Sequence, residues 1–426
     1  MRAGTLDDSP QVALPAAMTA EAVPNIYRNR DFLQFITVRF LAMVAMQIQS
    51  VAIGWQIYEM EGTAFALGMV GLCQFAPMFL VTLPAGDIID RTDQRKVFSV
   101  ALALQALCSG IFIFLTFSGT TKSWPYFAVL VLFGVSRGFS GPSGQSLLPF
   151  LVPPEKLPRA IAFNSSAFTT AVIAGPALGG FLYYFGPVIT YGTCFVAFAI
   201  SAMLVLALGG RKREDIVQHG SARERVIEGL RFVRQRPVVL GAMSLDLFAV
   251  LLGGATALLP IFAKDILHVG ITGLGFLRSA PAVGAALTAF ALARWPLERK
   301  VGTRMFAAVA IFGVATVVFG LSTNFYLSLA ALFALGASDM ISIYVRSSLV
   351  QFATPDSMRG RVSAVNMLFI GASNELGEFE SGITAAWFGA VPAVIIGGLG
   401  TLGIVAIWMK LFPDLRVIDH IDTRKS

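Results

Sequence analysis

The chain has 426 residues, of which 56% are hydrophobic and only 13% are charged, and its mean hydropathy is +0.73. Soluble globular proteins carry about 25% charged residues, so this composition excludes a chain of two or three soluble domains and indicates one polytopic membrane protein. The formal net charge is +7. Because the basic residues lie in short segments between apolar runs, we expect the lipid bilayer as a partner and no nucleic acid.

Long apolar runs follow one another along the whole chain after a polar start. A spanning helix needs about 20 apolar residues, and these runs are too long and too continuous for barrel strands. We therefore expect an all-α membrane protein with twelve transmembrane helices in two pseudo-symmetric six-helix bundles. The predicted spans are 32–57, 65–85, 97–117, 126–148, 161–185, 191–208, 238–262, 274–293, 305–321, 325–345, 362–388 and 392–411.

Short polar segments divide these spans into units. The expected units are a tail (1–31), a first bundle (32–208), a linker (209–237), a second bundle (238–411) and a second tail (412–426). Within the linker, 221–235 has apolar residues at helical spacing among arginines. This pattern predicts a basic amphipathic helix at the inner membrane face, with a solvated linker helix as the alternative.

The distribution of Lys and Arg predicts the orientation. If the N-terminus is inside, only Lys122 and Lys264 fall in outer loops, and the other basic residues outside the spans fall in inner segments. We expect a monomeric, multi-pass protein of the cytoplasmic (inner) membrane with both termini in the cytoplasm. The first thirty residues lack the apolar core of a cleavable signal peptide.

The two halves are related in sequence when residues 128–166 are compared with residues 202 positions later. Matches of proline, arginine and asparagine are not readily produced by apolar composition. They are Pro153 with Pro355, Arg159 with Arg361, and Asn164 with Asn366. Spans four and five therefore correspond to spans ten and eleven, which indicates a parallel repeat of the two halves.

Charged positions differ between the halves, with cations in the first and acids in the second. The same offset sets Arg137 opposite Asp339 and the apolar 175–180 opposite 377–382, which contains Glu378 and Glu380. A weaker alignment sets Arg39 opposite Asp246. We expect these positions to face a shared, hydrated interior rather than lipid.

The charged turn 86–96 lies between two apolar runs and reads Gly-Asp-Ile-Ile-Asp-Arg-Thr-Asp-Gln-Arg-Lys. Its pattern of Gly, three residues, Asp-Arg and a basic pair resembles the loop between spans two and three in the major facilitator superfamily. Asp93 stands where the family usually has Gly, which resembles the branch that holds siderophore and drug exporters. Gln94 replaces one of the usual basic residues.

This resemblance implies a conformational gate. In the family, the Asp at position 90 contacts the start of span eleven, where Arg361 lies here. The run 175–180 resembles an antiporter motif in span five, where Pro176 bends the helix and Gly175 and Gly179 admit another helix. The expected gate residues are Gly86, Asp90, Arg91, Arg95, Arg361, Gly175, Pro176 and Gly179.

Ionisable groups inside spans cost about 2.5–3.5 kcal/mol on insertion scales and persist where they are paired, hydrated or functional. Glu375 and Glu378 share a helix face, and two carboxylates in a poor dielectric cannot both ionise cheaply. Arg137 resembles the span-four arginine that the family associates with proton transfer. The expected proton-coupling set is Glu378, Glu375, Asp339, Arg137, Glu380 and Asp246; Arg278 and Arg346 are further charges inside spans. A static ion-pair network and a cationic substrate site are the alternatives.

The expected substrate cavity contains Arg39, Arg137, Asp246, Asp339 and Asn374. Cys73, Cys108 and Cys194 lie in apolar runs without metal spacing, and no nucleophile–base set occurs, so we expect no metal, no cofactor and no catalytic residues. The predicted function is proton-coupled export of a small amphipathic compound, siderophore or drug-like, by alternating access. The direction follows from the resemblance. Lipid or lysolipid transport and proton-coupled uptake remain open.

Overall fold

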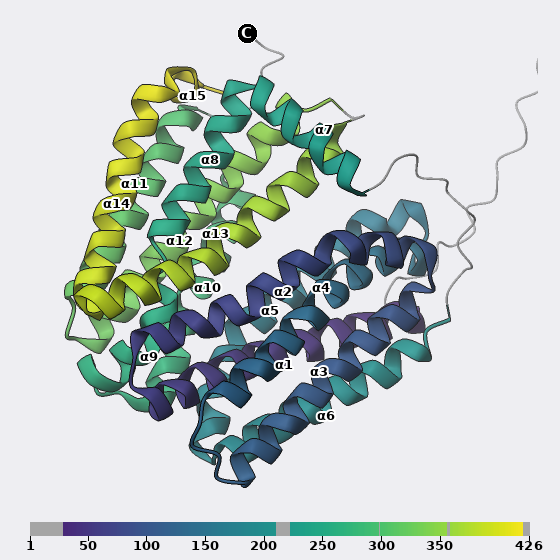
Figure 1. The fold of residues 1–426 in the computed structure, drawn as a ribbon. Helices are drawn as coiled ribbons and strands as arrows, with labels where there is room; N and C mark the ends of the chain where they lie inside the picture. Colours follow the sequence, from purple (N-terminus) through teal and green to yellow (C-terminus); the bar gives the residue numbers. More distant parts are fainter. Residues whose placement is uncertain (1–28, 210–221, 298, 356–357, 421–426) are drawn as a thin grey trace, which may run out of the picture.

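The computed structural model describes residues 29–209, 222–297, 299–355 and 358–420. Within these ranges the chain is built almost entirely of helices, and no strand occurs in them (Figure 1). The turn between α1 (Arg30–Glu61) and α2 (Ala64–Arg91) is short and capped. Gly62 ends α1 with a φ of +64°, a left-handed conformation that glycine adopts without steric cost, and Thr63 then caps α2 by accepting from Ala66 N.

The first half contains six long helices that pack mainly on one another. Helix α1 packs on α5 and α6, α2 packs on α4, and α3 packs on both α4 and α6. Buried aromatic side chains pack where α3 ends and α4 and α6 begin, and the ring of Phe112 contacts those of Tyr126 and Tyr191. The helices are α1 (Arg30–Glu61), α2 (Ala64–Arg91), α3 (Gln94–Phe117), α4 (Trp124–Leu151), α5 (Leu157–Tyr184) and α6 (Pro187–Leu206), with the short η2 (Pro154–Lys156) before α5.

The second half repeats this pattern: α10 and α11 pack on α12, α11 also packs on α14, and α8 packs on α13 and α14. The long helices are α8 (Pro237–Leu252), α10 (Gly270–Arg294), α11 (Val301–Leu321), α12 (Phe325–Ala353), α13 (Arg359–Phe388) and α14 (Ala390–Leu411). The short elements are η3 (Ala255–Leu258), α9 (Leu259–Ile261), the π-helical η4 (Phe262–Ile266) and α15 (Pro413–Val417).

The predicted span 238–262 is not one continuous helix. Helix α8 ends at Leu252, and the chain continues through η3, α9 and η4. Gly253 and Gly254 disfavour a regular helix at this point. Gly254 also lies against α13, where an added Cβ would be 2.6 Å from the carbonyl oxygen of Gly377. The break therefore lets the chain approach the helix that carries the acidic residues.

Ten of the described helical segments are long and apolar enough to cross a membrane. The long helices α4 and α13 fall outside this set, and they carry Arg137 and the acidic residues of span eleven. Polar residues lower the mean hydropathy of a helix whose polar face is turned toward protein rather than lipid. The chain is thus an all-helical, multi-pass membrane protein.

A short helix, α7 (Ala222–Gln235), occupies the described part of the linker. Its Val233 is buried and packs with Val239, Met243 and Val365 of the second half. Its Glu228 forms an ion pair with Arg361, in which Oε2 of Glu228 lies 2.9 Å from Nε of Arg361. One face of α7 therefore binds the ends of α8 and α13, and its contact with a membrane stays a prediction.

The sequence repeat has a direct structural counterpart at Gly134 and Gly336. A Cβ added at Gly134 of α4 would lie 2.2 Å from the carbonyl oxygen of Gln74 in α2. A Cβ added at Gly336 of α12 would lie 1.9 Å from the carbonyl oxygen of Pro281 in α10. Both halves thus use a glycine at the same repeat position for a backbone-to-backbone helix crossing.

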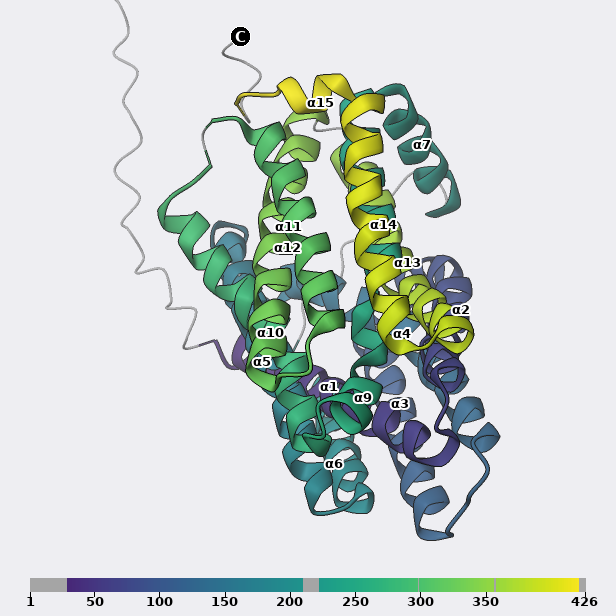
Figure 2. The ribbon, with the colours of Figure 1, turned by 90° about the vertical axis from the view of Figure 1, so that its left-hand side faces the viewer.

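The halves meet through α2 with α13 and α5 with α10, which lie side by side in Figure 2. An added Cβ at Gly382 of α13 would lie 2.5 Å from the Cα of Gly68 in α2. One at Gly180 of α5 would lie 2.6 Å from the carbonyl oxygen of Ile271 in α10. Small residues therefore allow close helix contact between the halves.

Candidate functional site

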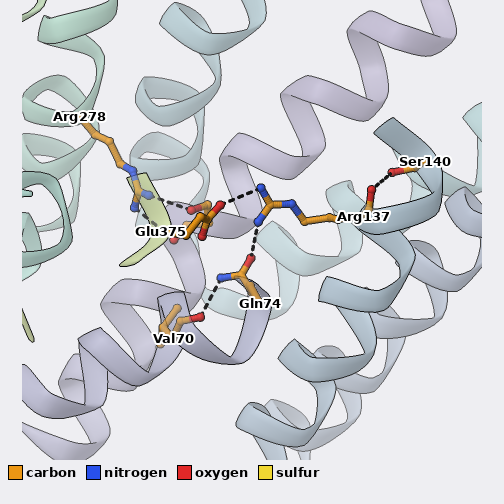
Figure 3. A network of polar contacts seen from close by, with 7 residues as sticks. Val70, Gln74, Arg137, Ser140, Arg278 and Glu375 are labelled. Carbon is orange, nitrogen blue, oxygen red and sulfur yellow. Dashed lines mark hydrogen bonds and ion pairs between the residues drawn. The ribbon is translucent and has the colours of Figure 1, made fainter. Parts of the chain in front are cut away.

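An ion pair joins the two halves inside the molecule. Arg137 of α4 places Nη2 3.0 Å from Oε1 of Glu375 in α13, and these side chains are 22% and 17% exposed. Arg137 Nη1 also donates to Gln74 Oε1 of α2 at 3.5 Å (Figure 3). An arginine from the first half thus contacts a carboxylate of the second.

The local packing of α2 and α4 explains why Gln74 reaches Arg137. The glycine at position 134 lets the backbone of α2 approach α4, and Gly138 continues this contact beside the carbonyl oxygen of Met78. Gln74 Nε2 donates to the Val70 carbonyl oxygen at 3.1 Å, which turns the amide oxygen of Gln74 toward the guanidinium (Figure 3). The arginine is therefore positioned by the helix crossing itself.

A second guanidinium approaches the same carboxylates from the other side. Arg278 of α10 and Arg137 point toward Glu375 from opposite directions in Figure 3. Arg278 is also tied across the halves, because its Nη2 donates to Ser50 Oγ of α1 at 2.9 Å. The charges of Glu375, Arg278 and Arg137 all act on the partly buried Glu378. We call Arg137, Arg278, Glu375 and Glu378 the charge cluster; it contains two guanidinium groups and two carboxyl groups.

Asp339 and Asp246 belong to a separate cluster within the second half. Arg346 of α12 places Nη1 2.5 Å from Asp246 Oδ2 of α8, with side chains only 3% and 7% exposed. The charges of Asp246 and Arg346 act on Asp339. The hydrogen bonds of Arg137 go to Glu375 and Gln74 instead, so the repeat positions Arg137 and Asp339 serve different clusters.

A cavity of about 210 Å³ lies beside Arg137 in the first half. Arg39 and Arg137 are its charged lining residues, and Gln105, Ser140 and Asn164 add polar groups. The rest of the lining is apolar or glycine: Ala42, Met43, Met46, Met78, Phe98, Leu102, Gly141 and Phe168. The expected cavity residues Asp246 and Asp339 are not among its lining, and Asn374 is an exposed residue of α13.

The remaining sequence-predicted residues lie along these helices. Glu380 accepts a hydrogen bond from Thr384 Oγ1 of its own helix at 2.7 Å. Gly175 and Gly179 of α5 lie against α1, where an added Cβ would be 2.5 Å from the Gln47 Cβ or 3.0 Å from the Ile48 Cα. Pro176 is buried, and its carbonyl oxygen faces Gly275 of α10. The span-five motif thus contacts both a partner within its half and one across the halves.

The predicted gate turn joins the end of α2 to the start of α3. The side chain of Asp90 lies outside the described part of the structure, so its contact with Arg361 stays a prediction. Arg361 pairs with Glu228. Arg95 donates from Nη1 to the Leu208 carbonyl oxygen at 2.7 Å. Arg91 is exposed at the end of α2, and Gly86 is a partly buried residue of the same helix.

Sequence reasoning did not assign the contacts of Gln74 and Ser50, and it named Arg278 without a role. Gln74 offered a signal, because it is an amide inside the otherwise apolar run 65–85. Its partner depends on the α2–α4 crossing, which one sequence does not fix. Among the described residues, no cluster of three His, Cys, Asp or Glu side chains is placed to hold a metal ion.

Comparison with known proteins gives a family and a fold. The model of a family described as transmembrane secretion effector (MFS_3) matches residues 26–426. The enterobactin exporter EntS of Escherichia coli O139:H28 (strain E24377A / ETEC) is 24% identical over 369 residues, which cover 85% of this chain and 84% of the exporter. The enterobactin exporter EntS of Shigella boydii serotype 18 (strain CDC 3083-94 / BS512) matches with the same identity and coverage.

Solved transporters share the fold at low identity. An inward-facing, occupied bacterial homologue of the human lysosomal transporter Spinster superposes with a TM-score of 0.71 at 12% identity, over 91% of this chain and 97% of its own. The nucleoside transporter NupG superposes with a TM-score of 0.67 at 13% identity, over 90% of this chain and 99% of its own. An inward-facing bacterial homologue of the iron transporter ferroportin superposes with a TM-score of 0.66 at 18% identity, over 91% of this chain and 99% of its own.

Proposed function

Because this chain belongs to the transmembrane secretion effector family of the major facilitator superfamily, we propose that it is a proton-coupled exporter of a small amphipathic compound. The Arg137–Glu375 ion pair between the halves carries this proposal, since it links a group that can bind a proton to the contact that must change during transport. The similarity to enterobactin exporters supports the direction and a siderophore or drug-like substrate.

The proposed architecture is twelve transmembrane helices in two pseudo-symmetric six-helix bundles, with both termini in the cytoplasm. The packing within each half, the matched glycines at 134 and 336, and the placement of Lys and Arg support it. Ten segments have the length and hydropathy of a membrane span, and we propose that the long helices α4 and α13 are the other two spans. The charge cluster and the cavity are both built from one chain, which supports a monomeric working unit in the inner membrane.

The charge cluster gives the coupling step. With both carboxylates ionised, two anions balance two guanidinium groups, and Arg137 binds Glu375 between the halves. Adding one proton to a carboxylate leaves a guanidinium without its full counter-charge, which weakens the contact. Proton uptake and release therefore change the relative energies of two arrangements of the halves, as alternating access requires. The Asp246–Arg346–Asp339 cluster holds α8 and α12 together within one half.

The test is transport by purified protein in liposomes that enclose a pH-sensitive dye. A panel of siderophores, antibiotics, dyes and lysolipids is added, and antiport of a substrate appears as a pH change inside. Glu378→Gln should still exchange that substrate but should no longer accumulate it in response to a pH gradient. Arg304→Gln, which changes an exposed arginine of α11, is the control. An unchanged pH dependence in Glu378→Gln removes Glu378 from the mechanism.

The same experiment separates the other functions. Lysolipid movement without a pH change favours lipid transport over proton-coupled export. Substrate and protons moving in the same direction indicate uptake symport. Substrate exchange with no pH dependence in wild-type protein, combined with loss of folding stability in Glu375→Gln, indicates a static ion-pair network.

A further inference from the structure

The two arginines of the cavity differ in their partners. Arg137 is paired with Glu375 at 3.0 Å. Arg39, in the first third of α1, is only partly exposed and has no hydrogen bond or ion pair to any residue that the structure describes. The cavity therefore carries one positive charge that the surrounding protein does not balance. An unpaired cation away from bulk water is costly, so an anion that enters the cavity gains a ready partner.

The packing around Gly144 holds this guanidinium in place. A Cβ added at Gly144 of α4 would lie 2.6 Å from Arg39 Nη1 and 3.2 Å from the ring of Phe98. The missing side chain thus leaves the space that the guanidinium of Arg39 and the edge of Phe98 occupy. Because Phe98 also lines the cavity, a positive group and an aromatic surface are presented side by side.

The other residues that line the cavity are suited to bind the apolar part of a ligand. Met43, Met46 and Met78 contribute flexible, polarizable thioethers that adapt to different shapes, and Phe168 adds a second ring. Gln105 donates to Ser140 Oγ at 3.0 Å and supplies an amide at one wall. A ligand that combines a small aromatic or branched apolar group with one negative charge matches both parts.

We propose that this cavity binds an amphipathic anion and that Arg39 is the residue that recognises its negative charge. This inference rests on the proposed transport function and narrows its substrate class to anions, but it concerns binding, which does not need proton coupling. Arg39 acts as a specificity residue, and Gly144 acts through Arg39 as a positioning residue.

The test compares three compounds that share one ring system and differ in charge: naphthalene-1-carboxylate, naphthalene-1-carboxamide and naphthalene-1-methylammonium. Their affinities are measured by calorimetric titration of the full chain in lipid nanodiscs, with empty nanodiscs subtracted. The carboxylate should bind about tenfold more tightly than the amide, as expected for one charge-assisted hydrogen bond, and the ammonium should bind most weakly.

Variants locate the preference. Arg39→Gln should reduce the carboxylate affinity to that of the amide, whereas Arg39→Lys should keep part of the preference because it retains the charge without the planar fork. Gly144→Ala should lower the preference for the carboxylate by displacing the guanidinium of Arg39. If Arg39→Gln does not fold, Gly144→Ala can test the inference in its place. Arg304→Gln is the matched control, since it removes one exposed arginine elsewhere.

Equal binding of the three compounds, no binding of the carboxylate, or a carboxylate preference that survives in Arg39→Gln would overturn the inference. The two proposals fail separately. Glu378→Gln tests the coupling step and is not a control for this cavity, because Arg137 belongs to both the charge cluster and the cavity lining. Anion binding that depends on Arg39 without any pH-driven transport would contradict the proposed function and leave this inference standing.

Discussion

Tyr58, near the end of α1, donates a hydrogen bond to the carboxylate of Asp265 in the π-helical turn η4 of the second half. The neighbouring Lys264 places Nζ 5.5 Å from the centre of the Tyr58 ring, where a cation is attracted by the π-face. Tyr58 itself is buried, whereas both charged residues are exposed. A buried residue of one half is thus held by two adjacent charges of the other, at the end of the molecule far from α7 (Figure 1).

Replacing Tyr58 with Phe should make this end open more often. The change removes a hydrogen bond to a charged acceptor, worth roughly 1.5–3 kcal/mol, while it keeps the ring and its packing. If the halves alternate between two arrangements, the open population should rise by about tenfold or more. Spin labels at Glu61→Cys and Tyr326→Cys, in a chain without native cysteines, would report the change as a longer distance by pulsed electron resonance.

Tyr183→Phe is the matched control for that experiment. The Tyr183 hydroxyl lies 3.5 Å from Glu59 within the same half, so its loss should leave the distance between the labels unchanged. Equal distance distributions in Tyr58→Phe and wild-type protein would show that the hydrogen bond does not hold the halves together.

Much of the fold follows from the sequence because lipid demands long, uniform apolar helices. The predicted spans fall on helices of the structure, and most of these helices extend beyond the apolar run at one end or at both ends. Helix α12, for example, continues to Ala353, although the apolar run ends near residue 345. The break after Leu252 was not predicted, because Leu, Ala and Phe on both sides of Gly253 and Gly254 keep the run apolar.

The charged residues of the site could be predicted from the sequence, but which of them form ion pairs could not. Arg137 and Glu375 could be singled out because an ionisable group inside an apolar helix is expensive. Which acid Arg137 would contact depends on how α4 and α13 are rotated, and on the depth of each charge. The repeat set Arg137 opposite Asp339, yet equivalent positions in a parallel repeat need not touch. Asp339 lies near Asp246 and Arg346 instead.

Alanine at Gly336 should strongly destabilise the second half, because its Cβ would lie 1.9 Å from the Pro281 carbonyl oxygen and backbone cannot move aside as a flexible side chain can. Gly134→Ala should act similarly at the α2–α4 crossing, with a contact of 2.2 Å. Overpacking typically costs about 1–3 kcal/mol, and a backbone clash belongs at or above the upper end. Thermal unfolding in detergent would measure both losses.

Gly192→Ala is the control for these variants, since a Cβ there meets no heavy atom within 4 Å. It should be neutral or slightly stabilising, as Ala favours a helix over Gly. A loss in Gly192→Ala as large as that in Gly336→Ala would mean that the crossing distance does not set the cost.

Asp93 should stabilise the turn before α3 in a pH-dependent way. Its Oδ1 accepts from Arg95 N at 3.0 Å, and Arg95 Nη2 lies 3.2 Å from Oδ2. Burial works to raise the pKa of Asp93, but hydrogen bonds from the side chain and backbone of Arg95 and the charges of Arg95 and Lys96 lower it overall. Because the folded pKa is depressed, the stabilisation is complete above the unfolded value of about 4 and is lost as pH falls through the folded pKa.

Asp93→Ala should therefore lower thermal stability at neutral pH by about 0.5–1 kcal/mol, which allows for the exposure of this pair. The difference from wild-type protein should shrink as pH falls below about 4. Asp93→Asn keeps a good helix cap but loses the charge, so its stability should lie between the two. A difference that does not change with pH would assign the whole effect to the cap.

Arg346 should matter more for stability than either acid beside it. It is almost fully buried against Asp246, and the charges of both act on Asp339. Asp246→Asn leaves Arg346 near one remaining carboxylate. Arg346→Met leaves two carboxylates without their cation, and removing one partner of a buried pair costs about 3–5 kcal/mol. At neutral pH, Arg346→Met should therefore unfold at a lower temperature than Asp246→Asn.

The pH dependence distinguishes this charge effect from a packing defect. In Arg346→Met, protonation of the two acids removes their repulsion and their unpaired charge, so stability should partly recover as the pH is lowered from slightly alkaline to acidic. Asp246→Asn should show little recovery, because its remaining acid keeps Arg346 nearby. Arg304→Met, at an exposed position, controls for the loss of one arginine. If Arg346→Met is equally destabilised at every pH, the loss comes from packing, and the two aspartates are not held ionised by this arginine.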